Sequence, residues 1–458
     1  MNLHIDKIEH YFFIGVAGVG MSAIAQYLAE EGKDVSGSDR YFKPGEDNEN
    51  FTKLEKAGVK CFLQDGSGIN EQTQVVVIST AVEEINPEFV KAKQLHIPII
   101  KRSELLAWIA EKRRTIAVGG TSGKSTTVAM IYHILQQNGL EPGIITGAGL
   151  TPLIRQGKLG NASRGNGDWL VIEADESDGS ITQYHPEIGV LLNIDKDHQE
   201  ISELMEIFKK FQQNTRGAFI VNRSNALSKE LSVNQQYDFS STDAAAGFNA
   251  SDFSQVGFEI KFSINNVPFT IHTIGKHNME NALAAVSVAN QCGISIEQSA
   301  AALKTFEGIY RRNQILGEKN GAWFIDDYAH NPVKCAAAIG SCQHGSGRVI
   351  AWFQPHGYGP TRFLKNDFIQ EFSEVLREQD ILIMSEIFYA GGTAVKNISS
   401  NEIIEGVKQN GKNAVFIENR KGLAGYIKQI IQPEDVVLFM GARDPGLADF
   451  SKSVFESI

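Results

Sequence analysis

The sequence has little of several features that would point to particular protein classes. Its four cysteines, in 458 residues, are scattered, and none stands in CxxC spacing. A disulfide framework and a cysteine metal site are therefore not expected. No apolar run is long enough to cross a bilayer, and the first residues carry acids where a secretory signal would be basic. We expect a cytoplasmic protein without membrane insertion.

Positive charge is scarce as well. Lys and Arg together number 43 against 54 Asp and Glu, which gives a formal net charge of −11. Without a basic block, a nucleic-acid partner is not expected. What remains is an ordinary globular composition, 42% hydrophobic and 21% charged. A chain of this length exceeds one hydrophobic core, so several domains are expected.

Strand patterns alternate with helical patterns along almost the whole chain, which predicts an α/β fold with parallel sheets. Three segments are distinguished, with limits at residues 1–108, 109–308 and 309–458. Late in the second segment, residues 258–274 alternate apolar and polar side chains and predict a hairpin followed by a helix. The third segment repeats strand then helix.

The segment TIAVGGTSGKSTTVAMIYHIL, residues 115–135, is an apolar strand, a glycine turn and a helix. Such a turn points backbone N–H groups and the positive helix end into one concavity, which suits phosphates. Lys124 would reach the outer phosphates and Ser125 a magnesium ion. The strict GxxxxGK[ST] pattern fails because Val118 replaces its first glycine. A plain structural turn with a surface lysine is the alternative.

Acidic residues follow the apolar strand WLVI: Glu173, Asp175, Glu176 and Asp178. The carboxyl ends of parallel strands are where α/β proteins bind ligands, so at least one of these carboxylates is expected to hold the metal, although each alone could be a solvated strand end. A second apolar strand, IGVLLNID, leads to His198, which in isolation would be an ordinary surface histidine.

A first glycine turn, Gly15-Val-Ala-Gly18-Val-Gly20, lies between a strand and a helix, and Asp39 ends the next strand. This is the layout of a dinucleotide-binding βαβ unit, with an acid placed for a ribose hydroxyl. The glycine order is GxxGxG rather than GxGxxG, so a plain packing turn is the alternative. If a second phosphate-bearing ligand binds here, the protein joins two phosphate-rich substrates.

The chain resembles the Mur ligases, ATP-dependent enzymes that build the peptide stem of peptidoglycan. The resemblance rests on motifs in one order along nearly the whole chain: FIGVAGVGMSAIA, VSGSD, ISTAV with INPE, GTSGKSTT, EADESDGS, NIDKDH, GKHNMENALAA, YRR, DDYAHNP, FQPH and MGARDP. It implies a Rossmann-like N-terminal domain for a UDP-sugar, a central P-loop ATPase domain and a Rossmann-like C-terminal domain for an amino acid. It also implies a ligase reaction through an acyl phosphate.

The resemblance implies roles by position. Residues expected to bind ATP are Gly120, Thr121, Gly123, Lys124, Ser125, Thr126, Asn278, Asn281, Arg312 and Asp327, with the two asparagines facing the adenine. Ser125, Glu173 and His198 would hold Mg²⁺. Residues expected to bind the UDP-sugar are Gly15, Gly18, Gly20, Met21, Ser38, Asp39 and Ser79. Lys124, His198, Arg312 and His330 would be catalytic, and Arg312, Asp327 and His330 would reach ATP from the third domain.

Several positions depart from the family pattern. Ser122 stands where histidine is usual in the loop, Ser125 where threonine is usual, Ala17 where the sugar loop has glycine, and Gly357 where FQPH is followed by arginine. The expected acceptor is UDP-N-acetylmuramate and the favoured amine is L-alanine, acting in a monomer or homodimer. A related ligase that attaches a recycled tripeptide is the nearest alternative; its relatives carry tyrosine where this chain has Ser177.

Two alternatives come from other classes. A nicotinamide-dependent oxidoreductase would use the first glycine turn but would leave GKST, EADES and DDYAH without a role. A nucleotide-binding regulatory protein without catalysis is suggested by the departures at Ser122 and Gly357. Phosphate release that needs both a UDP-sugar and an amine separates these alternatives from a ligase.

Overall fold

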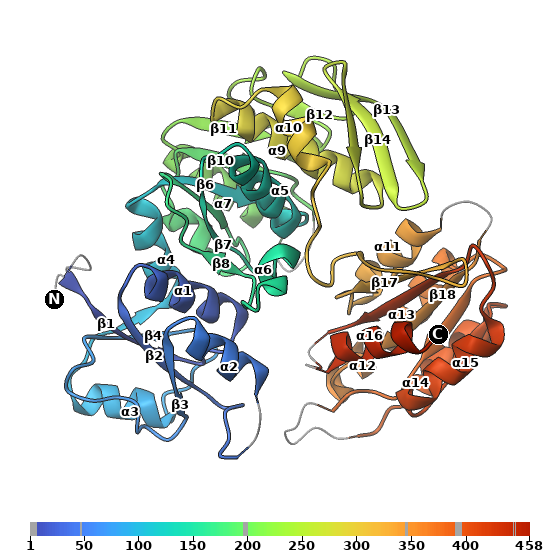
Figure 1. Cartoon of the computed structure of the whole chain (residues 1–458), viewed down its shortest axis with the longest axis horizontal. Coiled ribbons are helices and arrows are strands. Elements are labelled where there is room, and N and C mark those ends of the chain that lie inside the picture. The colour runs from blue at the N-terminus through green and yellow to red at the C-terminus, as the bar shows by residue number, and fades with distance from the viewer. Residues whose placement is uncertain are drawn as a thin grey trace. The chain divides into compact units, whose positions relative to one another are not determined.

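The computed structural model describes residues 7–45, 48–195, 200–343, 347–389, 396–442, 444 and 446–458. Their strands form four sheets (Figure 1). The chain divides into two compact units. The first unit comprises Met1–Ser254, Lys261–His272 and Lys276–Ile309, and the second comprises Gln255–Ile260, Thr273–Gly275 and Tyr310–Ile458. The domain limits expected near residues 108 and 308 stay a prediction.

The first sheet is parallel and has the strand order β3-β2-β1-β4-β5. Its strands are β1 (His10–Ile14), β2 (Asp34–Asp39), β3 (Val59–Leu63), β4 (Val75–Ile78) and β5 (Ile99–Lys101), and its helices are α1 (Val19–Glu30), α2 (Glu49–Lys56), α3 (Pro87–Gln94) and α4 (Arg102–Glu111). From β1 the chain adds β2 and β3 on one side of the sheet and then β4 and β5 on the other side, so the order of the strands reverses between β1 and β4. Ligands of open α/β sheets bind at such a point, outside the carboxyl ends of the strands.

The second sheet has the order β11-β10-β6-β9-β7-β8, and only the short edge strand β8 is antiparallel. Its strands are β6 (Arg114–Gly119), β7 (Gly143–Ile145), β8 (Ala162–Ser163), β9 (Trp169–Glu173), β10 (Ile188–Leu191) and β11 (Ala218–Val221). The helices of this region are α5 (Lys124–Gln137), α6 (Thr151–Arg155), α7 (Ile201–Asn214), α8 (Ala226–Lys229), α9 (Lys276–Gln291) and α10 (Ile296–Leu303), with a 3-10 turn η2 (Ser180–Gln183). The strands are buried on both faces, as parallel strands covered by helices are.

The predicted hairpin over 258–274 is confirmed. A small sheet contains β12 (Phe239–Ser240), β13 (Phe248–Val256), β14 (Glu259–Ile264) and β15 (Val267–Ile271). Asn265 and Asn266 join β14 to β15 with φ values of 47° and 69°. Two consecutive positive φ values define the tight turn that suits the twist of a two-residue hairpin, and asparagine tolerates them better than most residues.

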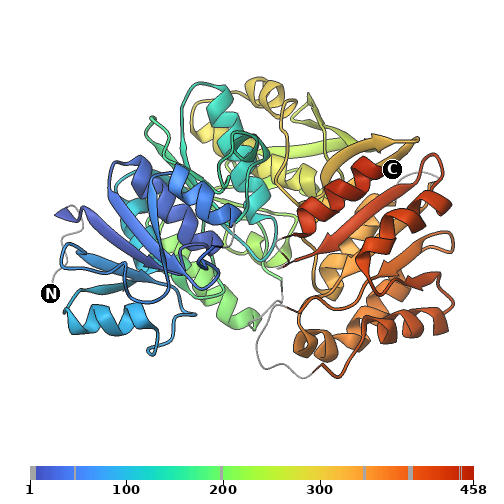
Figure 2. The same ribbon diagram turned by 60° about the horizontal axis from the view of Figure 1, so that its bottom comes forward.

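The fourth sheet lies in the second unit and has the order β16-β17-β21-β18-β19-β20. Its strands are β16 (Gln314–Lys319), β17 (Ala322–Asp327), β18 (Val349–Gln354), β19 (Ile381–Met384), β20 (Ala414–Phe416) and β21 (Val436–Gly441), covered by α11 (Pro332–Cys342), α12 (Tyr358–Phe363), α13 (Lys365–Val375), α14 (Ser400–Gln409), α15 (Leu423–Ile430) and α16 (Leu447–Ser457). Strands β17 to β21 are parallel, as predicted, and β16 adds an antiparallel edge that the sequence analysis did not anticipate. Helices pack on both faces of this sheet (Figure 2).

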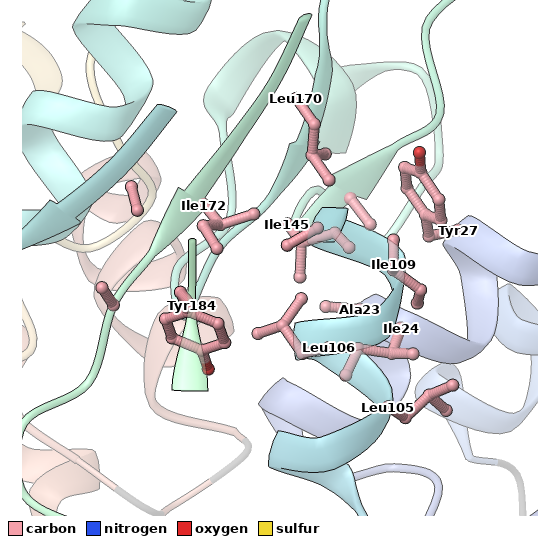
Figure 3. Packing of buried hydrophobic residues seen from close by; sticks show 14 of the residues in the cluster. Ala23, Ile24, Tyr27, Leu105, Leu106, Ile109, Ile145, Leu170, Ile172 and Tyr184 are labelled. Carbon is pink, nitrogen blue, oxygen red and sulfur yellow. The ribbon is translucent and has the colours of Figure 1, made fainter. Parts of the chain in front are cut away.

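One hydrophobic core joins the first and second sheets within the first unit (Figure 3). Ile24 and Tyr27 of α1 and Leu106 of α4 belong to the same buried cluster as Leu170 and Ile172 of β9. The cluster therefore fixes the glycine turn that precedes α1 relative to the sheet that carries the GKST loop. A bilayer-crossing helix is not found anywhere in the part of the chain that the structure describes.

A buried polar network lies beside this core. Asn161 donates from Nδ2 to the Val19 carbonyl at 2.8 Å and to Ser22 Oγ at 2.9 Å, and it accepts a 2.9 Å hydrogen bond from Gln26 Nε2. Its own carbonyl accepts from the backbone N–H of Thr146 at 3.0 Å. Asn161 therefore ties the first turns of α1 to the end of β7.

We expect Asn161→Ala to lower the free energy of unfolding by about 1–3 kcal/mol, because it leaves buried polar groups of α1 without partners. Chemical denaturation of the full chain measures this. Asn138→Ala is the matched control, since Asn138 caps α5 through one hydrogen bond to Ile134 of the same helix. An Asn161 variant no less stable than the Asn138 variant would contradict the account.

Candidate active site

The GKST loop has the predicted strand, turn and helix. Strand β6 ends at Gly119, and α5 begins at Lys124. Gly120 and Gly123 have φ values of 134° and 85°, conformations that residues with a side chain rarely adopt. A Cβ placed on Gly123 would also lie 2.6 Å from Asn281 Oδ1. The loop therefore needs glycine at both positions for its shape.

Asn193, after β10, holds this loop. Its Oδ1 accepts hydrogen bonds of 2.8 Å from Thr121 Oγ1 and from the backbone N–H of Ser122. Its Nδ2 donates to the Ser122 carbonyl at 3.1 Å. Asn193 was not among the residues predicted from the motifs. The available signal was its place at the end of the strand that pairs with β6, because the carboxyl ends of neighbouring parallel strands meet at one edge.

Lys124 lies against a buried carboxylate. Its Nζ donates to the Gly120 carbonyl at 2.6 Å and to the two carboxylate oxygens of Glu176 at 3.0 and 2.8 Å. The side chains of Lys124 and Glu176 are only 17% and 7% exposed. Burial raises the pKa of Glu176, while the charge of Lys124 acts in the opposite direction. Of the four acids at the end of β9 and just after it, Glu176 is thus the partner of the loop lysine.

Glu173 ends β9 directly beside the loop strand, opposite Val118 of β6. Its Oε1 accepts hydrogen bonds from Thr146 Oγ1 and, at 2.7 Å, from the backbone N–H of Gly147. Both bonds end on Oε1, which leaves Oε2 as the oxygen for the metal contact predicted for Glu173. Among the described residues no group of three His, Cys, Asp or Glu side chains could hold a metal ion.

The donor set fits magnesium. Mg²⁺ is commonly bound by one or two carboxylates together with substrate phosphates and water rather than by a full protein cage. Glu173 and the hydroxyl of Ser125, in the first turn of α5, supply oxygen donors of this kind. His198, the third expected ligand, lies outside the described residues. The metal assignments stay predictions.

Asn278 and Asn281 lie on α9, which packs against α5. Both are buried, and Asn281 Nδ2 donates to Asn278 Oδ1 at 3.1 Å. Thr127 Oγ1, on α5, donates to Asn281 Oδ1 at 3.3 Å. The structure thus brings Asn281 beside the start of α5, and the expected contact of both residues with adenine remains a prediction.

The first glycine turn is braced by the neighbouring strand β2. The N–H groups of Gly15 and Val16 donate to the Ser38 carbonyl at 2.8 and 3.0 Å. Asp39 Oδ2 accepts from the N–H of Ala17 at 3.0 Å, and its Oδ1 accepts from Tyr41 at 3.0 Å. Burial raises the pKa of Asp39. Asp39 therefore shapes the turn, in addition to the sugar contact expected of it.

The other residues expected at the UDP-sugar lie around the same turn. Gly18 precedes α1, and Met21 packs into the core. Ser79 directly follows β4, the neighbour of β1. Ser38 is fully buried, and its hydroxyl has no hydrogen-bond partner among the described residues. Their contacts with a sugar nucleotide stay predictions.

The residues expected to reach ATP from the third domain lie in the second unit. Arg312 is exposed, whereas the preceding Arg311 is buried. Asp327 accepts hydrogen bonds of 2.7 Å from the N–H groups of Asn313 and Ala329, and burial raises its pKa. The Nδ1 of His330 lies 3.0 Å from the Tyr328 carbonyl.

Arg311 anchors this segment. Its Nε donates to both oxygens of Asp326 at 3.0 and 3.1 Å, and its Nη2 donates to the Gly441 carbonyl at 2.9 Å. Ser451 Oγ also donates to Asp326, at 2.8 Å. Burial raises the pKa of Asp326 to about 6, although the charge of Arg311 opposes the shift. Of the two adjacent arginines, Arg311 is therefore structural and Arg312 is exposed to solvent, and its expected contact with ATP stays a prediction.

Comparison with known proteins identifies the protein family to which the chain belongs. The model "Mur ligase family, catalytic domain" matches residues 10–114, "Mur ligase middle domain" matches residues 118–289, and "Mur ligase, glutamate ligase domain" matches residues 311–443. The chain belongs to the Mur ligase family. The resemblance inferred from the ordered motifs is thereby confirmed.

Particular relatives are similar over almost their whole length. UDP-N-acetylmuramate–L-alanine ligase of Syntrophomonas wolfei is 35% identical over 451 residues, 94% of each chain. The enzyme of the same name from Carboxydothermus hydrogenoformans is 35% identical over 96% of this chain and 95% of its own. The crystal structure of UDP-N-acetylmuramate-alanine ligase from Thermotoga maritima has a TM-score of 0.79 and 25% identity, with 98% of both chains covered. A murein peptide ligase from Psychrobacter arcticus shares the fold, with a TM-score of 0.66, 20% identity and 98% of both chains covered.

We expect Arg311→Met to lower the free energy of unfolding by about 3–5 kcal/mol at about pH 8, because it leaves the Asp326 carboxylate buried without its cation. Asp326 has a higher pKa in the folded protein than in the unfolded one, so the folded state binds more protons and the free energy of unfolding falls as pH rises through the two pKa values. At about pH 5 the Asp326 carboxyl of the folded protein is mostly protonated and needs no cation beside it. The loss of stability caused by Arg311→Met should therefore be smaller at about pH 5 than at about pH 8. Chemical denaturation at both pH values measures it.

Arg312→Met is the matched control for this variant. Because Arg312 is exposed, its replacement should change the free energy of unfolding by less than about 0.5 kcal/mol, while its expected role at ATP predicts a loss of turnover. Equal stability of the two variants would show that Arg311 does not anchor the segment.

Proposed function

We propose that the protein is an ATP-dependent ligase that joins L-alanine to the carboxylate of UDP-N-acetylmuramate in cytoplasmic peptidoglycan precursor synthesis. The observation that carries this proposal is the 35% identity to an enzyme of that name over 94% of both chains. The loop of Gly120 to Ser125 supports it, since a glycine turn at a helix start, with an adjacent lysine, is suited to a triphosphate.

A free carboxylate is a poor electrophile, and phosphorylation by ATP turns one of its oxygens into a leaving group. The amine then attacks the acyl phosphate, and the tetrahedral intermediate expels phosphate. Positioning and charge stabilisation are the main tasks of a protein in phosphoryl transfer. Lys124, at the start of α5, is the cation we assign to the transferred phosphoryl group, with Glu176 holding its ammonium over the loop.

Magnesium belongs to this proposal. Glu173 and Ser125 are the described residues that we assign to hold it. When bound, the ion would neutralise charge on the phosphate oxygens. Thr146 and Gly147 orient Glu173 through its Oε1. The chain's own contribution is therefore to fix one carboxylate at the edge of the nucleotide-binding loop.

The test of the proposal is phosphate release from ATP with UDP-N-acetylmuramate and a panel of amines. L-alanine should give the highest kcat/KM, and omission of either the UDP-sugar or the amine should abolish release. A preference for the tripeptide L-alanyl-γ-D-glutamyl-meso-diaminopimelate would show that the protein catalyses the recycling reaction rather than L-alanine ligation. No phosphate release with any amine would reject the ligase.

Lys124→Ala should lower kcat at least about 100-fold, because it removes a preorganised charge from the transferred phosphoryl group. Its thermal unfolding should remain cooperative, which circular dichroism checks. Lys209→Ala is the control, since Lys209 is an exposed partner of Glu206 on α7. Full activity of the Lys124 variant would remove the proposed role of the loop.

A further inference from the structure

The side chain of Arg102 lies against the first glycine turn, at Gly20. The sequence motifs assigned no role to Arg102. It begins α4, but its side chain packs on the first turn of α1. A Cβ placed on Gly20 would lie 3.2 Å from Cδ and Nη1 of Arg102 and 3.4 Å from its Nε. The missing side chain of Gly20 is therefore what lets the guanidinium group lie against the start of α1.

The guanidinium group of Arg102 has more donors than protein partners. Its Nη2 lies 3.5 Å from Asp178 Oδ2, and this long contact is the ion pair recorded for it within the described residues. The Arg102 side chain is 24% exposed. Arginine carries five N–H donors in a planar fork, so this one long contact leaves donors that a ligand can use.

The electrostatics of the position favour an anion. Backbone N–H groups give the start of a helix a positive potential, which a cation raises further. Arg102 lies on the first turn of α1, which has no acidic residue in that turn and no side-chain cap at Gly18, whereas the first turn of α4 itself carries Glu104. A ligand with two phosphates would relieve this accumulation of positive charge.

We propose that Arg102 binds the diphosphate of the acceptor sugar nucleotide together with the first turn of α1. This inference rests on the proposed function, and it adds a binding residue from α4 to a site otherwise built from β1, α1, β2 and β4. Asp178 holds the guanidinium group over Gly20. Because Asp178 belongs to the acidic turn after β9, the same arginine connects the sugar-nucleotide turn with the sheet that carries the GKST loop.

The shared chemistry of the ligand is a diphosphate, which UDP and ADP both carry. Isothermal titration calorimetry of the full chain with UDP, UMP and ADP shows whether Arg102 binds the diphosphate of the uridine nucleotide or that of the adenine nucleotide. The wild-type protein should bind UDP more tightly than UMP. Arg102→Ala should weaken UDP binding about 10- to 100-fold, the loss typical of a charge-assisted contact, while UMP and ADP affinities should change less than about threefold.

Two further variants make the test independent of folding. Arg102→Lys keeps the charge without the planar fork, so its UDP affinity should lie between those of the wild type and Arg102→Ala. Arg216→Ala removes an exposed arginine that pairs with Glu111 in the same unit and should leave UDP binding unchanged. Retained ADP binding shows that a variant is folded.

A UDP-to-UMP affinity ratio in Arg102→Ala equal to that of the wild type would overturn the inference. Weakened ADP binding with unchanged UDP binding would overturn it too, because Arg102 would then serve the other nucleotide. A wild-type protein that binds UDP no better than UMP, yet ligates UDP-N-acetylmuramate, would reject only the role of Arg102. Failure to bind or use any uridine nucleotide would instead reject the proposed function.

Discussion

The parallel alignment of β10, β6, β9 and β7 is the constraint on which the nucleotide site depends. Because these strands run in one direction, their carboxyl ends meet at one edge, with Gly119 opposite Leu191 and Val118 opposite Glu173. The glycine loop, its brace Asn193, and Glu173 are therefore adjacent although up to about 75 residues separate them in the sequence. The backbone therefore sets the position of the nucleotide site, and single side chains set its hydrogen bonds and charge.

The first unit contains two sheets whose parallel strands end at such an edge, and one hydrophobic core packs the two sheets together. The hydrophobic cluster of α1, α4 and β9 fixes the first sheet against the second, and Asn161 adds a buried polar link from α1 to Thr146, whose hydroxyl donates to Glu173. A reaction that passes a phosphoryl group to a carboxylate needs its reactants in near-attack geometry. A shared rigid core provides the fixed spacing that such a reaction requires.

Local sequence patterns predicted much of this arrangement. The strand, turn and helix at residues 115–135 and the acids after β9 follow from periodicity and from the direction of parallel strands. The partner of Lys124 did not, because four nearby carboxylates satisfy the same pattern and only the tertiary path of the turn selects Glu176. The resemblance assigned Arg312, not Arg311, to ATP, and local periodicity gave no role to Arg311. A positive φ of 55° at Arg311 and its ion pair with the buried Asp326 show that Arg311 is the arginine that turns inward.

Three of the four departures from the family pattern can be related to the local backbone. Ser122 is exposed, and its backbone N–H and carbonyl rather than its side chain bind Asn193. Ala17 is held through its N–H by Asp39, which any residue except proline allows. Gly357 has a φ of 74°, a conformation that strains residues with a side chain. The loop geometry therefore tolerates the first two changes, and the third stands in a backbone conformation that favours glycine.

The central claim is that residues 119–126 bind the triphosphate of ATP. A crystal structure with a non-hydrolysable ATP analogue and magnesium tests it most directly. The account predicts the outer phosphates at the N–H groups that begin α5, with Lys124 Nζ in contact with them. An analogue bound elsewhere, with Lys124 still paired only to Glu176 and Gly120, would contradict the account.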